Sequence, residues 1–109
     1  MPSQPAPTFR ARVEDGPDRV LVVAEGELDI LGAPRLAEVI PVGGSSPIVI
    51  DLAAVEFMDS TGLRALLVAR TAATTAGRPF ALARPSAAVT RVLELVDLTG
   101  EFEVVELPG

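Results

Sequence analysis

The chain has 109 residues, a formal net charge of −6 and 49% apolar residues, of which few are aromatic. This length suits one compact domain with a core of aliphatic side chains. The negative charge argues against a basic surface for nucleic acid or for an anionic membrane.

The sequence contains no histidine, no cysteine and no lysine. It therefore lacks the usual general base, the thiolate nucleophile and the commonest ligand of transition metals. Its acidic residues show no recognisable metal-binding spacing either. Composition thus predicts no cofactor and no bound metal, and it disfavours an enzyme.

The N-terminal residues 1–7 are rich in proline and are predicted to form a disordered tail. They do not combine a basic region with an apolar core, so they do not resemble a signal peptide. No apolar run approaches the ~18 residues that a membrane span needs. The expectation is a cytoplasmic protein with a folded domain over residues 8–109.

Alternating apolar residues predict a half-buried strand over 8–14. A turn rich in Asp, Gly and Pro follows, and then a second strand over 19–26, so the two should form an antiparallel hairpin. A short helix is expected over 33–40, because Pro34 suits the first turn of a helix.

The nearly continuous apolar run 48–52 predicts a strand that is buried on both faces. Residues 53–58 are expected to be the connecting loop. The main helix is predicted over 60–76, with apolar residues along one broad face and Gly77 as its stop.

The last third of the chain predicts a short strand over 80–83 and a helix that Ser86 caps. A final strand is expected over 102–106. The core face of that last helix is predicted from its apolar spacing: Val89, Val92, Leu93 and Val96. The fold class is therefore α/β: a mixed β-sheet, with an antiparallel N-terminal hairpin plus parallel strands, flanked by three or four helices.

The most informative segment, Asp59-Ser60-Thr61, lies where a strand's exit loop becomes a helix N-terminus. Free backbone N–H groups and the positive end of the helix dipole gather there. Asp59 can cap the helix, which leaves the Ser60 hydroxyl outward at the first helical position. Gly62 is expected to leave the approach uncrowded. The segment is thus either a plain cap or a phosphorylation site.

One outer face of the predicted helix carries Thr61, Arg64 and Val68, which suits the edge of a docking surface. The arginines of the second half are spread along the chain and are interpreted most simply as solvated surface: Arg64, Arg70, Arg78, Arg84 and Arg91.

The segments 48–52 and 55–63 together resemble the signature of STAS domains, above all the bacterial anti-sigma factor antagonists. The resemblance extends over about residues 8–106. Further similarity lies in the segments 26–29, 76–79, 89–93 and 102–104.

This resemblance implies that Ser60 is phosphorylated by an anti-sigma factor that is itself a serine kinase. The unphosphorylated protein would bind that anti-sigma factor and free the sigma factor, and a serine phosphatase would reset it. A monomer is also implied. The resemblance and the helix face together predict these partner-binding residues: Asp29, Asp59, Ser60, Thr61, Gly62, Arg64 and Val68. The alternative is a STAS interaction module of a transporter or a stress-signalling assembly, without a phospho-switch.

Overall fold

The computed structural model describes residues 8–41 and 43–107, so the predicted tail at 1–7 lies outside the described residues. Its strands are β1 (Phe9–Asp15), β2 (Val20–Leu28), β3 (Ile48–Met58), β4 (Phe80–Ala83) and β5 (Glu103–Val105). Its helices are α1 (Gly32–Val39), α2 (Ser60–Thr75) and α3 (Ala87–Leu95). None of these helices is long and apolar enough to cross a membrane.

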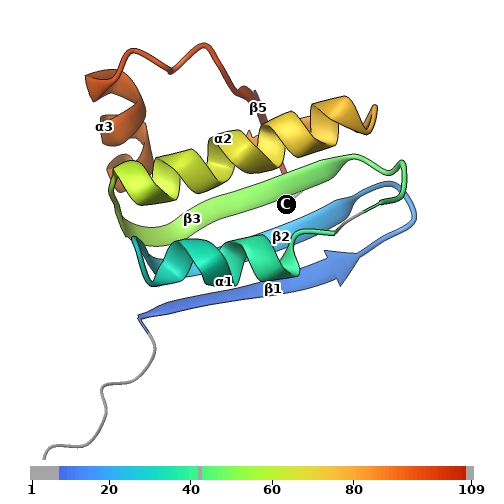
Figure 1. The fold of residues 1–109 in the computed structure, drawn as a ribbon, viewed down its shortest axis with the longest axis horizontal. Coiled ribbons are helices and arrows are strands. Elements are labelled where there is room, and N and C mark those ends of the chain that lie inside the picture. The colour runs from blue at the N-terminus through green and yellow to red at the C-terminus, as the bar shows by residue number, and fades with distance from the viewer. Residues whose placement is uncertain (1–7, 42, 108–109) are drawn as a thin grey trace, which may run out of the picture.

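The strands form one mixed sheet in the order β1-β2-β3-β4-β5. β1 and β2 pair antiparallel, which confirms the predicted hairpin, and the remaining neighbours pair parallel. Figure 1 shows α1 and α2 side by side over one face of the sheet, with their first turns at the same end. The predicted α/β class and element order are confirmed, with three helices in the described residues.

The core lies between this sheet face and the helices. Alternate residues of β3 face it, and Ile50 and Leu52 have no exposed surface. α2 contributes the expected apolar face, in which Leu66 is also fully buried. The buried members from α2 are Leu63, Leu66, Ala69 and Ala73. Apolar burial of this kind contributes roughly 25 cal/mol per Å² and supplies the main favourable term in folding.

The prediction of a connecting loop over residues 53–58 is wrong, because β3 continues without a break to Met58. Its second half pairs with the end of β2 after two register shifts, each of which adds one residue to β3. Such bulges hide the regular alternation from a reading of sequence periodicity. Val55 and Met58 are nonetheless buried, as the inner face of a strand requires.

The buried Asp51 stabilises the first of these shifts. One of its carboxylate oxygens accepts a hydrogen bond from the backbone N–H of Ala53 at 3.1 Å. The other oxygen pairs with the guanidinium of Arg84, which follows β4. Asp51 therefore fixes the backbone that directly follows it in β3 and also joins β3 to the residue after β4.

The end of α3 also differs from expectation. Ser86 caps the helix as predicted, accepting a hydrogen bond from the backbone N–H of Val89 at 3.3 Å. Val96, however, was expected in the core and is 46% exposed. The chain leaves the helix there and turns at Asp97, whose φ is +59°. Leu98, placed by that turn, packs against the core instead.

Two arginines that were predicted to be solvated surface residues instead make contacts that stabilise the fold. Arg78 is buried and donates hydrogen bonds to the backbone carbonyls of Ser46 and Gly43. Arg70 donates to the carbonyl of Glu101, pairs with its carboxylate at 3.5 Å and lies over the ring of Phe102. Both side chains tie α2, or the turn after it, to distant loops.

Candidate functional site

The N-terminus of α2 is capped by Asp59, as the sequence predicts. Its backbone is extended, and its side-chain oxygen accepts hydrogen bonds from the N–H groups of Thr61 at 2.9 Å and Gly62 at 3.1 Å. These are two of the donors that a helix start leaves without an intrahelical partner. The carboxylate also lies favourably at the positive end of the helix dipole.

Ser60 is the first residue of α2 and is exposed. Because Asp59 supplies the cap, the fold makes no use of the Ser60 hydroxyl: the side-chain hydrogen bonds found among residues 8–41 and 43–107 do not include it. An unengaged hydroxyl at a helix start can accept a phosphoryl group without breaking a native contact.

Replacing Asp59 with alanine is expected to lower the free energy of unfolding by about 1 kcal/mol, the usual cost of losing an N-cap. Asp59→Asn keeps an oxygen acceptor, so its free energy of unfolding should fall by only a small part of that amount. Urea unfolding of both variants against wild type measures the difference. Equal losses in the two variants would show that the carboxylate charge, not the capping hydrogen bonds, stabilises the helix start.

Asp29 lies on the neighbouring loop, between β2 and α1. Its carboxylate accepts hydrogen bonds from the N–H groups of Leu31 and Gly32, both at 3.0 Å. The preceding residue, Leu28, is paired with Met58 at the ends of β2 and β3, and its carbonyl lies 3.4 Å from the N–H of Asp59. The loops that carry Asp29 and Asp59 are therefore adjacent at the same edge of the sheet.

Gly62 has a different role from the one expected. It is buried, so it does not keep an outer approach open. A Cβ atom at this position would lie 2.1 Å from the carbonyl oxygen of Leu28 and 2.9 Å from Cγ of Met58. Only glycine lets the first turn of α2 approach the strand ends this closely.

Thr61, Arg64 and Val68 share one side of α2, as predicted, and border a groove between α1 and α2. The groove has a volume of about 620 Å³. Its other lining side chains are mostly alanine, isoleucine and proline, and it contains two arginines and no acidic residue among those described. This composition fits an apolar segment of a partner better than a polar substrate.

Two exposed apolar side chains near this helix start, Ile30 and Leu31, were not predicted from the sequence, whereas the outward position of Val68 was. Ile30 is 69% exposed, Leu31 is 70% exposed and Val68 is 58% exposed. Ile30 lines the same groove as Val68. A signal was available, because two apolar residues directly after an aspartate that forms a tight turn cannot both point into the core. Apolar side chains gathered around a polar helix start are typical of protein-binding surfaces.

The pair of Asp51 and Arg84 joins the first half of β3 to the residue that directly follows β4. A hydrogen bond from Arg84 to Asp51, and then their opposite charges, raise the pKa of the Arg84 guanidinium above its ordinary value. Arg84 therefore stays charged, and the pair holds β3 and the end of β4 together rather than transferring protons. Within residues 8–41 and 43–107, no group of three or more acidic side chains could hold a metal ion.

Comparison with known proteins agrees with this arrangement. A family model described as "Mlab, STAS domain" matches residues 11–106 of the chain. The protein therefore belongs to the STAS-domain family. Its overall likeness is to an anti-sigma factor antagonist, as solved structures show.

The crystal structure of an anti-sigma factor antagonist from Mycobacterium paratuberculosis is similar to this chain at 33% sequence identity, with a TM-score of 0.77. That alignment covers 91% of this chain and 87% of the other. A structure of RsbS from Moorella thermoacetica, in which a serine is replaced by glutamate, is 25% identical with a TM-score of 0.71. The alignment covers 91% of this chain and 88% of the RsbS chain.

SpoIIAA, an anti-sigma factor antagonist, is similar in two forms. The unphosphorylated form is 19% identical, with a TM-score of 0.69 over 91% of this chain and 89% of that one. The phosphorylated form, from Bacillus, is 18% identical, with a TM-score of 0.66 over 91% of this chain and 92% of that one. At these identities the likeness shows the fold alone.

Proposed function

We propose that this protein is an anti-sigma factor antagonist that phosphorylation at Ser60 switches off. In the unmodified state it binds an anti-sigma factor that is also a serine kinase, and so releases a sigma factor. A serine phosphatase restores the binding form. One observation at the start of α2 carries the proposal. Asp59 caps the helix, so the exposed side chain of Ser60 is free for modification.

The fold should tolerate a phosphate at this position. A phosphoserine carries a charge of about −1.5 to −2 near neutral pH. The helix dipole offsets part of that, by roughly 0.3–1 kcal/mol per charged group. The likeness of this fold to SpoIIAA in both its phosphorylated and its unphosphorylated form supports the same expectation.

An interface would respond differently. Two like charges about 4 Å apart repel by about 1 kcal/mol in water and about 4 kcal/mol at an intermediate effective dielectric. Removing the phosphate from water adds to this cost. A few kcal/mol correspond to roughly 10- to 1000-fold in affinity. Phosphorylation can therefore release a partner without a change in the shape of the domain.

The proposed contact surface consists of the start of α2, the loop before α1 and the groove between these helices. Its apolar part includes Ile30 and Val68, both largely exposed. The Mycobacterium relative supports an anti-sigma factor as the partner, because it is an anti-sigma factor antagonist with 33% identity. We propose a monomeric, non-enzymatic regulator with one domain over residues 8–109. The partner-binding residues in this proposal are Asp29, Asp59, Ser60, Thr61, Arg64 and Val68, with Gly62 positioning them.

The test is affinity purification from the native host with wild type, Ser60→Ala and Ser60→Asp, followed by intact-mass analysis. Wild type should carry one phosphate, and Ser60→Ala should carry none. Ser60→Ala should retain a kinase-like anti-sigma factor, which Ser60→Asp should bind about 10- to 1000-fold more weakly. Purified components then give the dissociation constants by calorimetry.

Thr61→Ala is the matched control, because Thr61 is the neighbouring hydroxyl residue in the same turn. It should still be phosphorylated, and phosphorylation should lower its own affinity for the partner by the same factor as in wild type. Loss of the phosphate in Thr61→Ala but not in Ser60→Ala would move the switch to the neighbouring residue. No phosphate in any form, with the same partners for all variants, would favour the STAS interaction module without a switch.

A further inference from the structure

The position of Arg64 in α2 places its side chain close to Ser60. The two residues are four apart in α2, so their Cβ atoms lie on one side of the helix, about 5–6 Å apart. Cα–Cβ bonds in a helix tilt toward its N-terminus, which directs the longer side chain at the later position back toward the earlier one. The guanidinium of Arg64 can therefore reach the position of a phosphate on Ser60.

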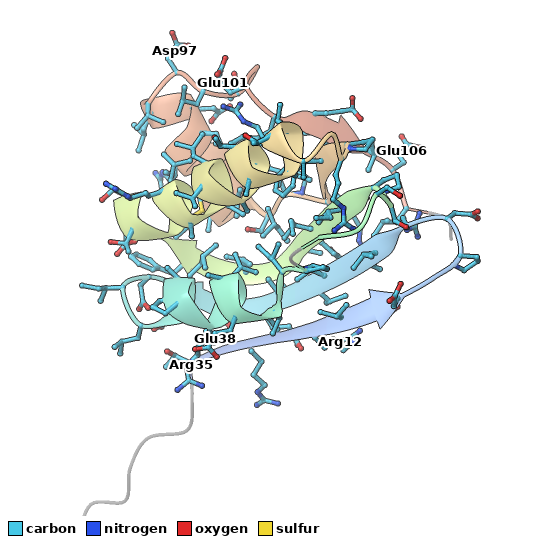
Figure 2. All side chains as sticks on the ribbon, turned by 45° about the vertical axis from the view of Figure 1, so that its right-hand side comes forward. Arg12, Arg35, Glu38, Asp97, Glu101 and Glu106 are labelled. Atoms are coloured by element: carbon cyan, nitrogen blue, oxygen red, sulfur yellow. The ribbon has the colours of Figure 1, made fainter. Side chains whose placement is uncertain are left out.

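Arg64 is also the basic residue available at this surface. The sequence has no other basic residue between Arg35 and Arg70. Arg64 is exposed, and the ion pairs found within residues 8–41 and 43–107 use other arginines. Arg35 lies on the outer side of α1, away from α2, as Figure 2 shows.

The groove beside Arg64 has a charge pattern opposite to that of the whole chain. The chain carries a net charge of −6, yet the charged residues that line the groove are Arg64 and Arg78. The guanidinium of Arg78 is buried and donates to backbone carbonyls, so it is already engaged. Arg64 is therefore the cation that this groove presents, and an acidic group on a bound segment complements it.

We infer that Arg64 is a shared cation: it pairs with an acidic group of the bound anti-sigma factor when Ser60 is unmodified, and with the phosphate when Ser60 is phosphorylated. This inference rests on the proposed function. Phosphorylation then acts on the interface twice, since it introduces a repulsive charge and also withdraws the attractive one. The same pairing compensates the phosphate within the free domain.

The pairing is tested without a kinase by incorporating phosphoserine at position 60 during translation. Phosphorus NMR then follows the second ionisation of the phosphate, whose pKa is ordinarily about 6. Arg64 should hold that pKa about 0.2–0.4 below its value in Arg64→Gln, the range expected for a charge pair at this helical spacing. Arg35→Gln removes the same charge from α1 and should leave the pKa as in wild type.

Equal pKa values of the phosphate in wild type and in Arg64→Gln would overturn the inference, whether or not Ser60 is phosphorylated in the cell. A second readout uses the anti-sigma factor recovered with Ser60→Ala. Arg64→Gln should weaken binding of the unmodified protein about 5- to 10-fold, whereas Arg35→Gln should not change it. Unchanged affinity in Arg64→Gln would also contradict the shared role. By contrast, equal partner affinity with serine and with phosphoserine at position 60 would overturn the proposed switch itself.

Discussion

Gly62→Ala is expected to destabilise the protein by about 3 kcal/mol or more, the upper range for overpacking a well-filled site. Two effects oppose each other here. In a helix interior, alanine is more favourable than glycine by about 1 kcal/mol. Its Cβ, however, would lie 2.1 Å from the carbonyl oxygen of Leu28 and 2.8 Å from Cγ of the same residue. That carbonyl belongs to the backbone at the end of β2, so it cannot move aside cheaply, and the clash dominates.

Urea unfolding measures this effect, and Gly100→Ala is the control. A Cβ at Gly100 would meet no atom within 4 Å, so that variant should stay within about 0.5 kcal/mol of wild type. Gly62→Ala should also lose partner binding, because the Gly62 N–H is one of the two that Asp59 holds. An increase in stability of about 1 kcal/mol would mean that helix propensity decides and that the close approach is absent.

Leu66→Ala is expected to cost about 2–5 kcal/mol, because it removes a fully buried side chain between α2 and the sheet. The loss combines the transfer free energy of the deleted atoms with the cavity that remains. For a domain of this size, the melting temperature should fall by more than about 8 °C. Differential scanning calorimetry measures the shift.

Leu95→Ala makes the same chemical change at a side chain that is 78% exposed. It should alter stability by no more than about 0.5 kcal/mol. The contrast separates burial from any general effect of leucine in a helix, since both residues lie in helices. Similar losses in both variants would contradict the assignment of the core face of α2.

The fold was predictable from sequence where periodicity is regular. The strand at 80–83 and the start of α2 at Ser60 match the structure, because apolar spacing and capping residues are local signals. The second half of β3 was not predictable in the same way. Its two added residues interrupt the alternation, and only pairing with β2 keeps the segment extended.

The site shows the same division. Capping by Asp59 and exposure of Ser60 follow from residue types near one another in the chain. The role of Gly62 depends on Leu28, which lies 34 residues earlier, so local patterns carry no trace of it. Burial of Arg78 likewise depends on acceptors at Gly43 and Ser46, which only the folded chain brings to it.

The pairing of Leu28 with Met58 has a consequence for the speed and the entropy of recognition. It joins the loops of Asp29 and Asp59 to the ends of the central strands, where each carboxylate holds two backbone N–H groups. A partner thus meets a backbone that is already ordered. Binding then costs mainly the freedom of exposed side chains, roughly 0.5–1.5 kcal/mol for each one immobilised. Association should therefore be limited by orientation of the two proteins, with no slow rearrangement of this domain beforehand.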